Sequence, residues 1–92
     1  MSEANLHLAE VLTISDAQSL YESLHGLLAQ ETSVVVDCAA VKRVDTAILQ
    51  CLLAFNLAAS RKGIACRWAN VSDALAKAVN LLGLDAEMGM GG

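Results

Sequence analysis

The chain contains no proline and few charged residues, and its aromatic residues are one Trp, one Tyr and one Phe. Because it also lacks a polar low-complexity stretch, nothing marks an internal linker, and a single domain over residues 1–92 is expected. Charged residues make up 17% of the chain and hydrophobic residues 55%, with a mean hydropathy of +0.49. With so apolar a composition, a partner is expected to cover part of the surface.

The chain also lacks the features of several functional classes. Its Lys and Arg residues are scattered along a chain of net charge −4, which argues against nucleic-acid binding. The longest uncharged run, residues 46–60, is shorter than the roughly 20 apolar residues that span a bilayer, and the N-terminus has no signal-like apolar segment. We therefore expect a cytoplasmic protein without direct membrane insertion.

Catalytic and metal-binding motifs are missing from the sequence as well. It has no glycine-rich phosphate loop, no nucleophile elbow and no histidine pair at ligand spacing. Cys38, Cys51 and Cys66 stand singly without CxxC spacing, which predicts buried thiols rather than metal ligands. We predict no catalytic residue, no metal site and no cofactor.

The apolar residues that are present alternate between strand and helix periodicity. Strands are expected within Leu6–Ile14, at Val34–Val36 closed by Asp37, and at Ile64–Trp68. Helices are expected from a Ser15–Gln18 capping box to near Gln30, from Asp45 to Lys62 ahead of Gly63, and from Ser72 to a Gly83–Leu84 stop. The predicted order is ββαβαβα with a loose Met88–Gly92 tail, and the connecting helix predicts that the Val34 and Ile64 strands are parallel.

The central helix shows two apolar sides. The first carries Ile48, Cys51, Leu52, Phe55, Ala58 and Ala59, and the second carries Thr46, Gln50, Leu53, Leu57 and Ser60, with Leu49 and Arg61 at its margins. The first side is the predicted core face. A solvated second side would carry charges where Leu53 and Leu57 stand, so either another helix of the domain or a partner is expected to cover it.

A hydroxyl and an acid stand at the start of this helix. Asp45 is expected as the N-cap, and the Thr46 hydroxyl either helps to satisfy the first N–H groups or accepts a phosphate. A phosphate on Thr46 would lie beside Asp45 and close to Leu49 and Leu53, where it would disfavour contact with an apolar or acidic partner. The functional alternative therefore predicts release of a partner on phosphorylation.

Three residues in the preceding loop are further candidates. Lys42 and Arg43 either are simply solvated or pair with Asp45 or an added phosphate. Asp37 ends a central strand, where α/β sheets place functional groups, but it also suits a turn in which its carboxylate accepts loop N–H groups. Both alternatives remain for each of these residues.

The order and spacing of several short motifs resemble the STAS domain family, which includes sulfate-transporter tails and anti-sigma factor antagonists. These motifs are Leu12-Thr13, Val36-Asp37, Val44-Asp45-Thr46-Ala47, Gly63 and Leu82-Gly83-Leu84. The resemblance covers nearly the whole chain. It implies a single non-catalytic α/β domain with a mixed, mostly parallel sheet and helices largely on one side.

The resemblance also implies a partner and a site. In sigma-regulating members, a kinase-like anti-sigma factor phosphorylates the residue after the aspartate, which is Thr46 here, and this releases the domain. The implied contact residues are Asp45, Thr46, Leu49, Gln50, Leu53 and Leu57. Ile48 stands where the motif usually has glycine, and its side chain is expected to crowd this surface.

Two other assignments use the same helix. The chain is also similar to the cytoplasmic STAS subunit of the ABC transporter that maintains outer-membrane lipid asymmetry, which implies binding to the transporter ATPase. A homodimer formed through the leucines of the second stripe, Leu53 and Leu57, is the remaining alternative.

Overall fold

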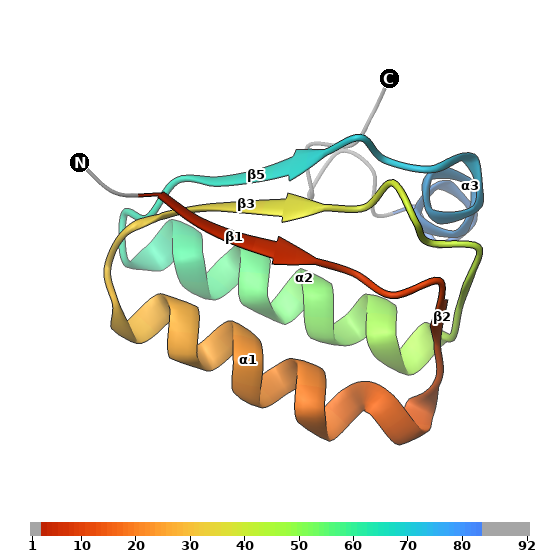
Figure 1. Cartoon of the computed structure of the whole chain (residues 1–92), viewed down its shortest axis with the longest axis horizontal. Coiled ribbons are helices and arrows are strands. Elements are labelled where there is room, and N and C mark those ends of the chain that lie inside the picture. The colour runs from red at the N-terminus through yellow and green to blue at the C-terminus, as the bar shows by residue number, and fades with distance from the viewer. Residues whose placement is uncertain (1–2, 84–92) are drawn as a thin grey trace.

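The computed structural model describes residues 3–83, so the predicted Met88–Gly92 tail and Leu84 lie outside the described residues. Helices α1 and α2 lie side by side beneath a three-stranded sheet, and α3 crosses its carboxyl end (Figure 1). The elements are β1 (Glu3–His7), β2 (Val11–Leu12), the 3-10 turn η1 (Ile14–Asp16), α1 (Ala17–Ala29), β3 (Ser33–Asp37), β4 (Arg43–Val44), α2 (Thr46–Arg61), β5 (Cys66–Ala69) and α3 (Asp73–Leu81).

The main sheet has the order β1-β3-β5, and both of its strand pairs are parallel. Val36 on the central strand pairs with Leu6 on one side and with Trp68 on the other, and it is fully buried. This confirms the predicted parallel arrangement of the two later strands. It also confirms an α/β fold with a mostly parallel sheet and its two long helices on one face (Figure 1).

Two local predictions near the start of α1 were incomplete or wrong. The Ser15–Gln18 capping box is not formed; instead, the Asp16 carboxylate accepts a hydrogen bond from the Thr13 backbone N–H at 2.8 Å. The chain therefore makes the turn η1 before α1 begins at Ala17. The two-residue strand β4 was not predicted, because a pairing this short leaves no periodic pattern in the sequence.

The core lies between the sheet and the two long helices. From the predicted core face of α2, Ile48, Leu52, Phe55 and Ala59 are buried, whereas Cys51 and Ala58 are only partly buried. The Phe55 ring meets the Trp68 ring edge-on with centroids 6.3 Å apart, which joins α2 to β5. The core face is thus essentially as predicted.

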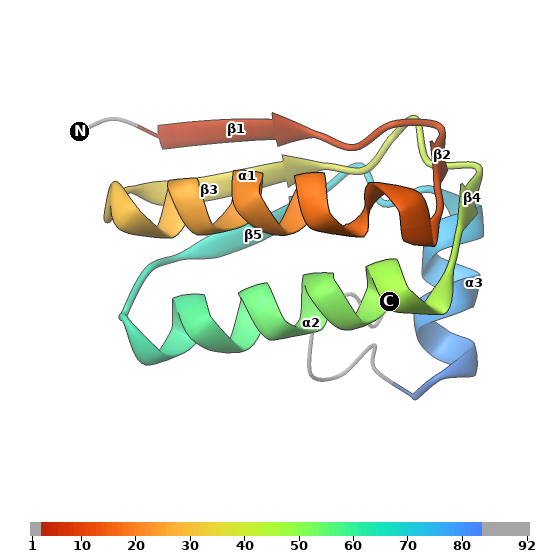
Figure 2. The same ribbon diagram turned by 90° about the horizontal axis from the view of Figure 1, so that it is seen from below.

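The predicted helix ends also hold. Gly63 and Gly83 adopt positive φ angles of 72° and 70°, the left-handed conformation that glycine tolerates after a helix. The Ser72 hydroxyl accepts a hydrogen bond from the Leu75 N–H at 3.2 Å and so caps α3. Helix α2 thus ends where the chain turns back into β5, whereas its start lies near α3 at the carboxyl end of the sheet (Figure 2).

Candidate functional site

Asp45 fixes the start of α2 through its backbone and its side chain separately. As predicted, it occupies the N-cap position with extended backbone, and its carbonyl accepts hydrogen bonds from Ile48 and Leu49. Its carboxylate does not cap α2, however, but accepts a hydrogen bond from the Ile14 backbone N–H at 3.1 Å. The turn η1 is therefore held beside the first turn of α2.

Thr46 is exposed on the first turn of α2, at the carboxyl end of the sheet. Within the described chain, its hydroxyl makes no hydrogen bond to the protein, so the structure gives no support to a capping role. The hydroxyl is accessible at the helix end that favours negative charge. Its surroundings allow either a partner contact or the addition of a phosphate.

We call the solvent-facing side of this helix the outer face of α2 and define it as Thr46, Gln50, Leu53 and Leu57. Thr46 and Gln50 are exposed, Leu53 is half-buried, and Leu57 keeps 43% of its surface exposed. Leu49, expected at the margin of this side, is only 2% exposed and belongs to the core. In the described structure the domain therefore leaves most of the outer face uncovered.

Sequence reasoning missed one neighbour of this face. Ile14 is 69% exposed, and the hydrogen bond to Asp45 holds its backbone beside the start of α2. Nothing in the sequence indicates that these residues meet, because they belong to different elements far apart in the chain. An exposed isoleucine thus lies beside the start of α2.

Ile48 was expected to crowd the outer face, but it does not. Its side chain has no exposed surface and packs in the core. The reason is angular: it lies two positions after Thr46, and successive residues of an α-helix are rotated by about 100°. Replacement of the motif glycine by isoleucine thus changes the core under the site and leaves its surface unobstructed.

The loop candidates do not join this site. The Lys42 ammonium lies 3.2 Å from the Glu10 carboxylate, and the backbone N–H groups of Lys42 and Arg43 both donate to the Glu10 carbonyl. Lys42 thus pairs with Glu10 instead of Asp45. The Arg43 side chain is exposed.

Asp37 acts at a different place, the end of β3. Its carboxylate accepts a hydrogen bond from the Ala39 N–H at 2.9 Å and lies 3.4 Å from His7 Nδ1. The Ala39 hydrogen bond, together with those from Asn70 and His7, lowers the pKa of Asp37 below its usual 3.8 despite some desolvation. These contacts are those of the turn alternative given above.

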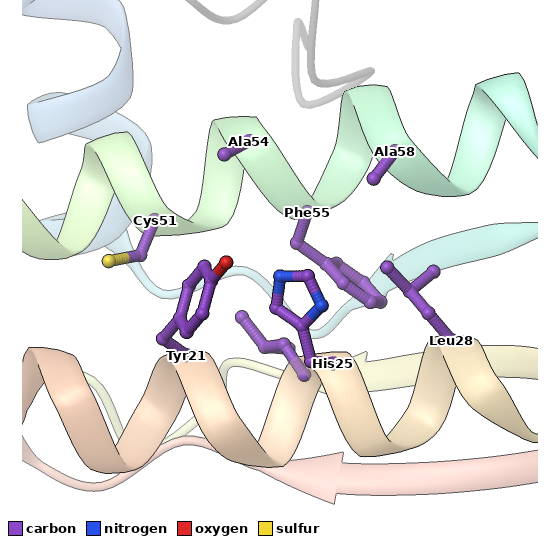
Figure 3. Close-up of a pocket in the computed structure, with 8 residues that line it drawn as sticks. Tyr21, His25, Leu28, Cys51, Ala54, Phe55 and Ala58 are labelled. Atoms are coloured by element: carbon purple, nitrogen blue, oxygen red, sulfur yellow. The ribbon is translucent and has the colours of Figure 1, made fainter.

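A separate apolar groove runs between α1 and α2. It has a volume of about 140 Å³, with Tyr21 and His25 of α1 facing Cys51, Ala54 and Ala58 of α2 (Figure 3). The buried side chains of Phe55 and Leu28 also line the groove (Figure 3). The groove lies on the flank of α2 that faces α1, so it is distinct from the outer face and exposes Cys51 in part.

The three cysteines differ in burial. Cys38 is fully buried, and desolvation together with the nearby Asp37 charge raises the pKa of its thiol to about 12. Cys66 is half-buried, and desolvation raises its pKa to about 11. The prediction of buried thiols therefore holds fully for Cys38 alone.

Two further findings bear on function. Within residues 3–83, no group of three or more His, Cys, Asp or Glu side chains is placed to hold a metal ion. No helix in the same range is both long and apolar enough to cross a membrane.

The fold and the exposed start of α2 define a small α/β domain suited to protein interaction. A family model described as "Mlab, STAS domain" matches residues 1–90, and the chain therefore belongs to the STAS domain family. The resemblance seen in the sequence is thereby confirmed. STAS domains are generally non-catalytic and generally mediate protein–protein interaction, so membership supports a regulatory or accessory role.

A solved structure shows the same fold. The crystal structure of a sulfate transporter family protein from Wolinella succinogenes is similar, with a TM-score of 0.71 and 16% sequence identity. The similarity covers 94% of this chain and 70% of that one. No curated protein matches the chain.

Proposed function

We propose that this chain is a non-catalytic cytoplasmic regulatory protein that binds a protein partner through the outer face of α2, with Ile14 at its edge. The observation that carries the proposal is an exposed helix face without charge: no charged residue occurs between Thr46 and Ser60. A helix face that contacts only water normally carries charged or polar residues, and leucine is not expected there. Burial against a partner gives Leu57 and Ile14 a favourable environment.

Phosphorylation of Thr46 is the proposed switch. A phosphate would add a charge of about −1.5 to −2 at the edge of an uncharged face, and a partner would have to desolvate that charge on binding. The start of α2 would tolerate the phosphate, because helix N-termini favour negative charge. Of the two cations in the preceding loop, Lys42 is already paired with Glu10, and the Arg43 side chain is exposed to water. The phosphate would therefore release the partner while the fold stays intact.

Two partner classes are consistent with this surface. The first is a kinase-like anti-sigma factor, for which the chain would act as an anti-sigma factor antagonist in signal transduction. The second is the ATPase of a lipid-transport ABC transporter, for which it would be an accessory subunit. Both would contact the same helix, so the identity of the partner decides between them.

A charge introduced at Thr46 tests the proposal. Tagged wild-type chain and the variants Thr46→Glu and Thr46→Ala would be used to capture partners from the native cell, with mass spectrometry to identify them. We expect Thr46→Glu to lower partner recovery at least about tenfold and Thr46→Ala to retain it, since a charged group is far costlier to bury than a methyl group. A captured kinase-like ATPase would indicate signalling, and an ATPase recovered with a permease would indicate transport.

The matched control is Gln18→Glu, which places the same charge on an exposed residue in the first turn of α1. It should bind like wild type. Equal recovery by Thr46→Glu and wild type, with both proteins folded by circular dichroism, would rule out docking at the start of α2.

A further inference from the structure

Strand β1 forms one flank of the main sheet. Within the described chain it pairs with β3 only, and its other side is open. Figure 2 shows that β1 lies to the outer side of α1 and is not covered by it. Helix α1 lies closer to β3, and α2 lies toward the opposite edge of the sheet. An open strand edge offers a row of unpaired backbone groups to another strand.

The direction of these backbone groups follows from one hydrogen bond. The Leu8 N–H donates to the Asp37 carbonyl at 3.0 Å, so Leu8 points toward β3. Backbone groups alternate in direction along a strand, and Leu6 and Ala4 therefore also point toward β3. The N–H and C=O groups of Glu3, Asn5 and His7 point away from the sheet.

Space is available beside this edge. A shallow groove of about 220 Å³ lies between β1 and α1, with Leu6 and Leu20 among its apolar residues. Ser19 and Ser23 line its α1 side. These small side chains leave the approach to β1 unobstructed.

We propose that two copies of this chain associate through their β1 strands, antiparallel and related by a two-fold axis at Asn5. In this register Asn5 faces Asn5 of the second copy, and Glu3 faces His7. All these residues direct their backbone groups outward, and they form the hydrogen-bonded pairs of an antiparallel ladder. The two main sheets become one continuous sheet across the axis.

The side chains favour this register. On the face of the sheet away from α1 and α2, Glu3 of one copy lies opposite His7 of the other, and the His7 side chain is 76% exposed. On the helix face, the small Ala4 side chain meets the larger Leu6. A two-fold axis at Glu3 would instead set the two Glu3 carboxylates opposite each other, which is unfavourable. In this register a second copy therefore avoids a pair of like charges and sets small side chains opposite larger ones.

The proposed contact is independent of the outer face of α2, which lies toward the other flank of the sheet (Figure 2). The first test is the mass of the purified full chain by sedimentation equilibrium over a range of concentrations. We expect a reversible monomer–dimer equilibrium. A chain that stays monomeric up to millimolar concentration would overturn the proposal.

Proline variants test the backbone directly. Asn5→Pro removes an outward N–H that the fold does not use, so it should give a folded monomer. Ala4→Pro is the matched control, because it removes an N–H that points to β3 and should lower the melting temperature. A dimer that survives in Asn5→Pro, or one that dissociates in Leu57→Asp instead, would contradict association at β1.

A charge variant covers the case in which Asn5→Pro is unstable. Glu3→Lys changes the group that faces His7 at both symmetry-related positions and should weaken dimerisation about tenfold. An unchanged dissociation constant would count against the register.

Cross-linking tests the symmetry axis. Facing residues of a hydrogen-bonded antiparallel pair have Cα atoms about 5.5 Å apart, within the range that a disulfide spans. Asn5→Cys should therefore form an intermolecular disulfide under mild oxidation. Glu3→Cys should not, because its symmetry mate would lie about 14 Å away at a rise of about 3.4 Å per residue. The wild-type chain with its native cysteines is the blank, and efficient cross-linking through Glu3→Cys would exclude the axis at Asn5.

Discussion

The Asp45 carboxylate accepts a hydrogen bond from the Ile14 backbone N–H at 3.1 Å, although the two residues are 31 positions apart in the chain. This contact brings an exposed isoleucine to the start of α2. The Asp45 carboxylate thus holds η1 beside the start of α2, and it makes no capping hydrogen bond to α2 itself.

The role of Asp45 can be measured. Asp45→Ala removes the acceptor for Ile14 and should lower the free energy of unfolding by about 0.5–1 kcal/mol, the low end for a hydrogen bond because this one is exposed. Asp45→Asn keeps a side-chain oxygen and should lose less. Urea denaturation provides the measurement, and Asp73→Ala, at an exposed aspartate of α3, serves as a control. If Asp45→Ala were as stable as wild type, the contact would have no stabilising role.

The two sides of α2 should respond differently to truncation. Leu49→Ala should cost about 2–4 kcal/mol, because it opens a cavity in a packed core. Leu57→Ala should change stability by no more than about 0.5 kcal/mol, since 43% of this residue is exposed and it lies outside the core. Thermal and urea unfolding of the two variants check this. Similar losses for both would show that Leu57 is part of the core.

The cysteines should react in a defined order. Cys51 borders the groove between α1 and α2 and should be labelled first by a thiol reagent at pH 8. Cys38 should react last, because its thiol is buried and its pKa is about 12, which leaves little thiolate at that pH. Mass spectrometry of labelled peptides gives the order. Early labelling of Cys38 in the folded protein would contradict its burial.

The raised thiol pKa values also predict a loss of stability in base. The folded state holds the protons of Cys38 and Cys66 more tightly than the unfolded state, in which the pKa is near 9.0. Their contribution is therefore complete below pH 9 and declines as the pH rises toward about 11 and 12. The melting temperature of Cys38→Ala should fall less steeply than that of wild type above pH 9.

Asp37 predicts the opposite dependence in acid. Its pKa is lowered in the folded state, chiefly by the Ala39 hydrogen bond, so its contribution is present above the usual 3.8 and is lost as the pH falls below it. Asp37→Asn should flatten the stability profile in this acidic range. Melting temperatures between pH 5 and pH 2 measure the effect, with Asp73→Asn as the matched control. Parallel profiles for wild type and Asp37→Asn would contradict the assignment.

Much of the fold follows from local patterns in the sequence. The β-branched run at Val34–Val36 marks the central strand, and the 3.6-residue spacing of Ile48, Leu52, Phe55 and Ala59 marks the buried side of α2. The glycine stops at Gly63 and Gly83 also mark real helix ends. These signals are strong because each depends on residues that are close in the chain.

What could not be predicted depends on contacts between distant residues. The partner of the Asp45 carboxylate is set by tertiary packing, as is the burial of Leu49 on a helix side whose other members are exposed or half-buried. Thr13–Asp16 and Ser15–Gln18 both have the spacing of a capping box, and the two pairs overlap in the same turn. The Thr13–Asp16 contact forms instead of the expected Ser15 cap. The outer face of α2 as a binding site therefore stays a prediction, and sequence reasoning gave no sign that Ile14 lies beside the start of this helix.

The sheet topology has a consequence for how the chain folds. Glu3 pairs with Ser33, and Val34 pairs with Cys66, so each pair of adjacent strands in the main sheet is joined through a helix. Each pairing closes a loop of about 30 residues, and such non-local closure slows the search for the native state. During synthesis β1 emerges well before its neighbour β3, and α1 emerges before it has a sheet to cover. The main sheet cannot form before the Val34–Val36 strand is available, because that strand pairs with both of its neighbours. We therefore expect the slow steps of folding to be the pairings made by this strand.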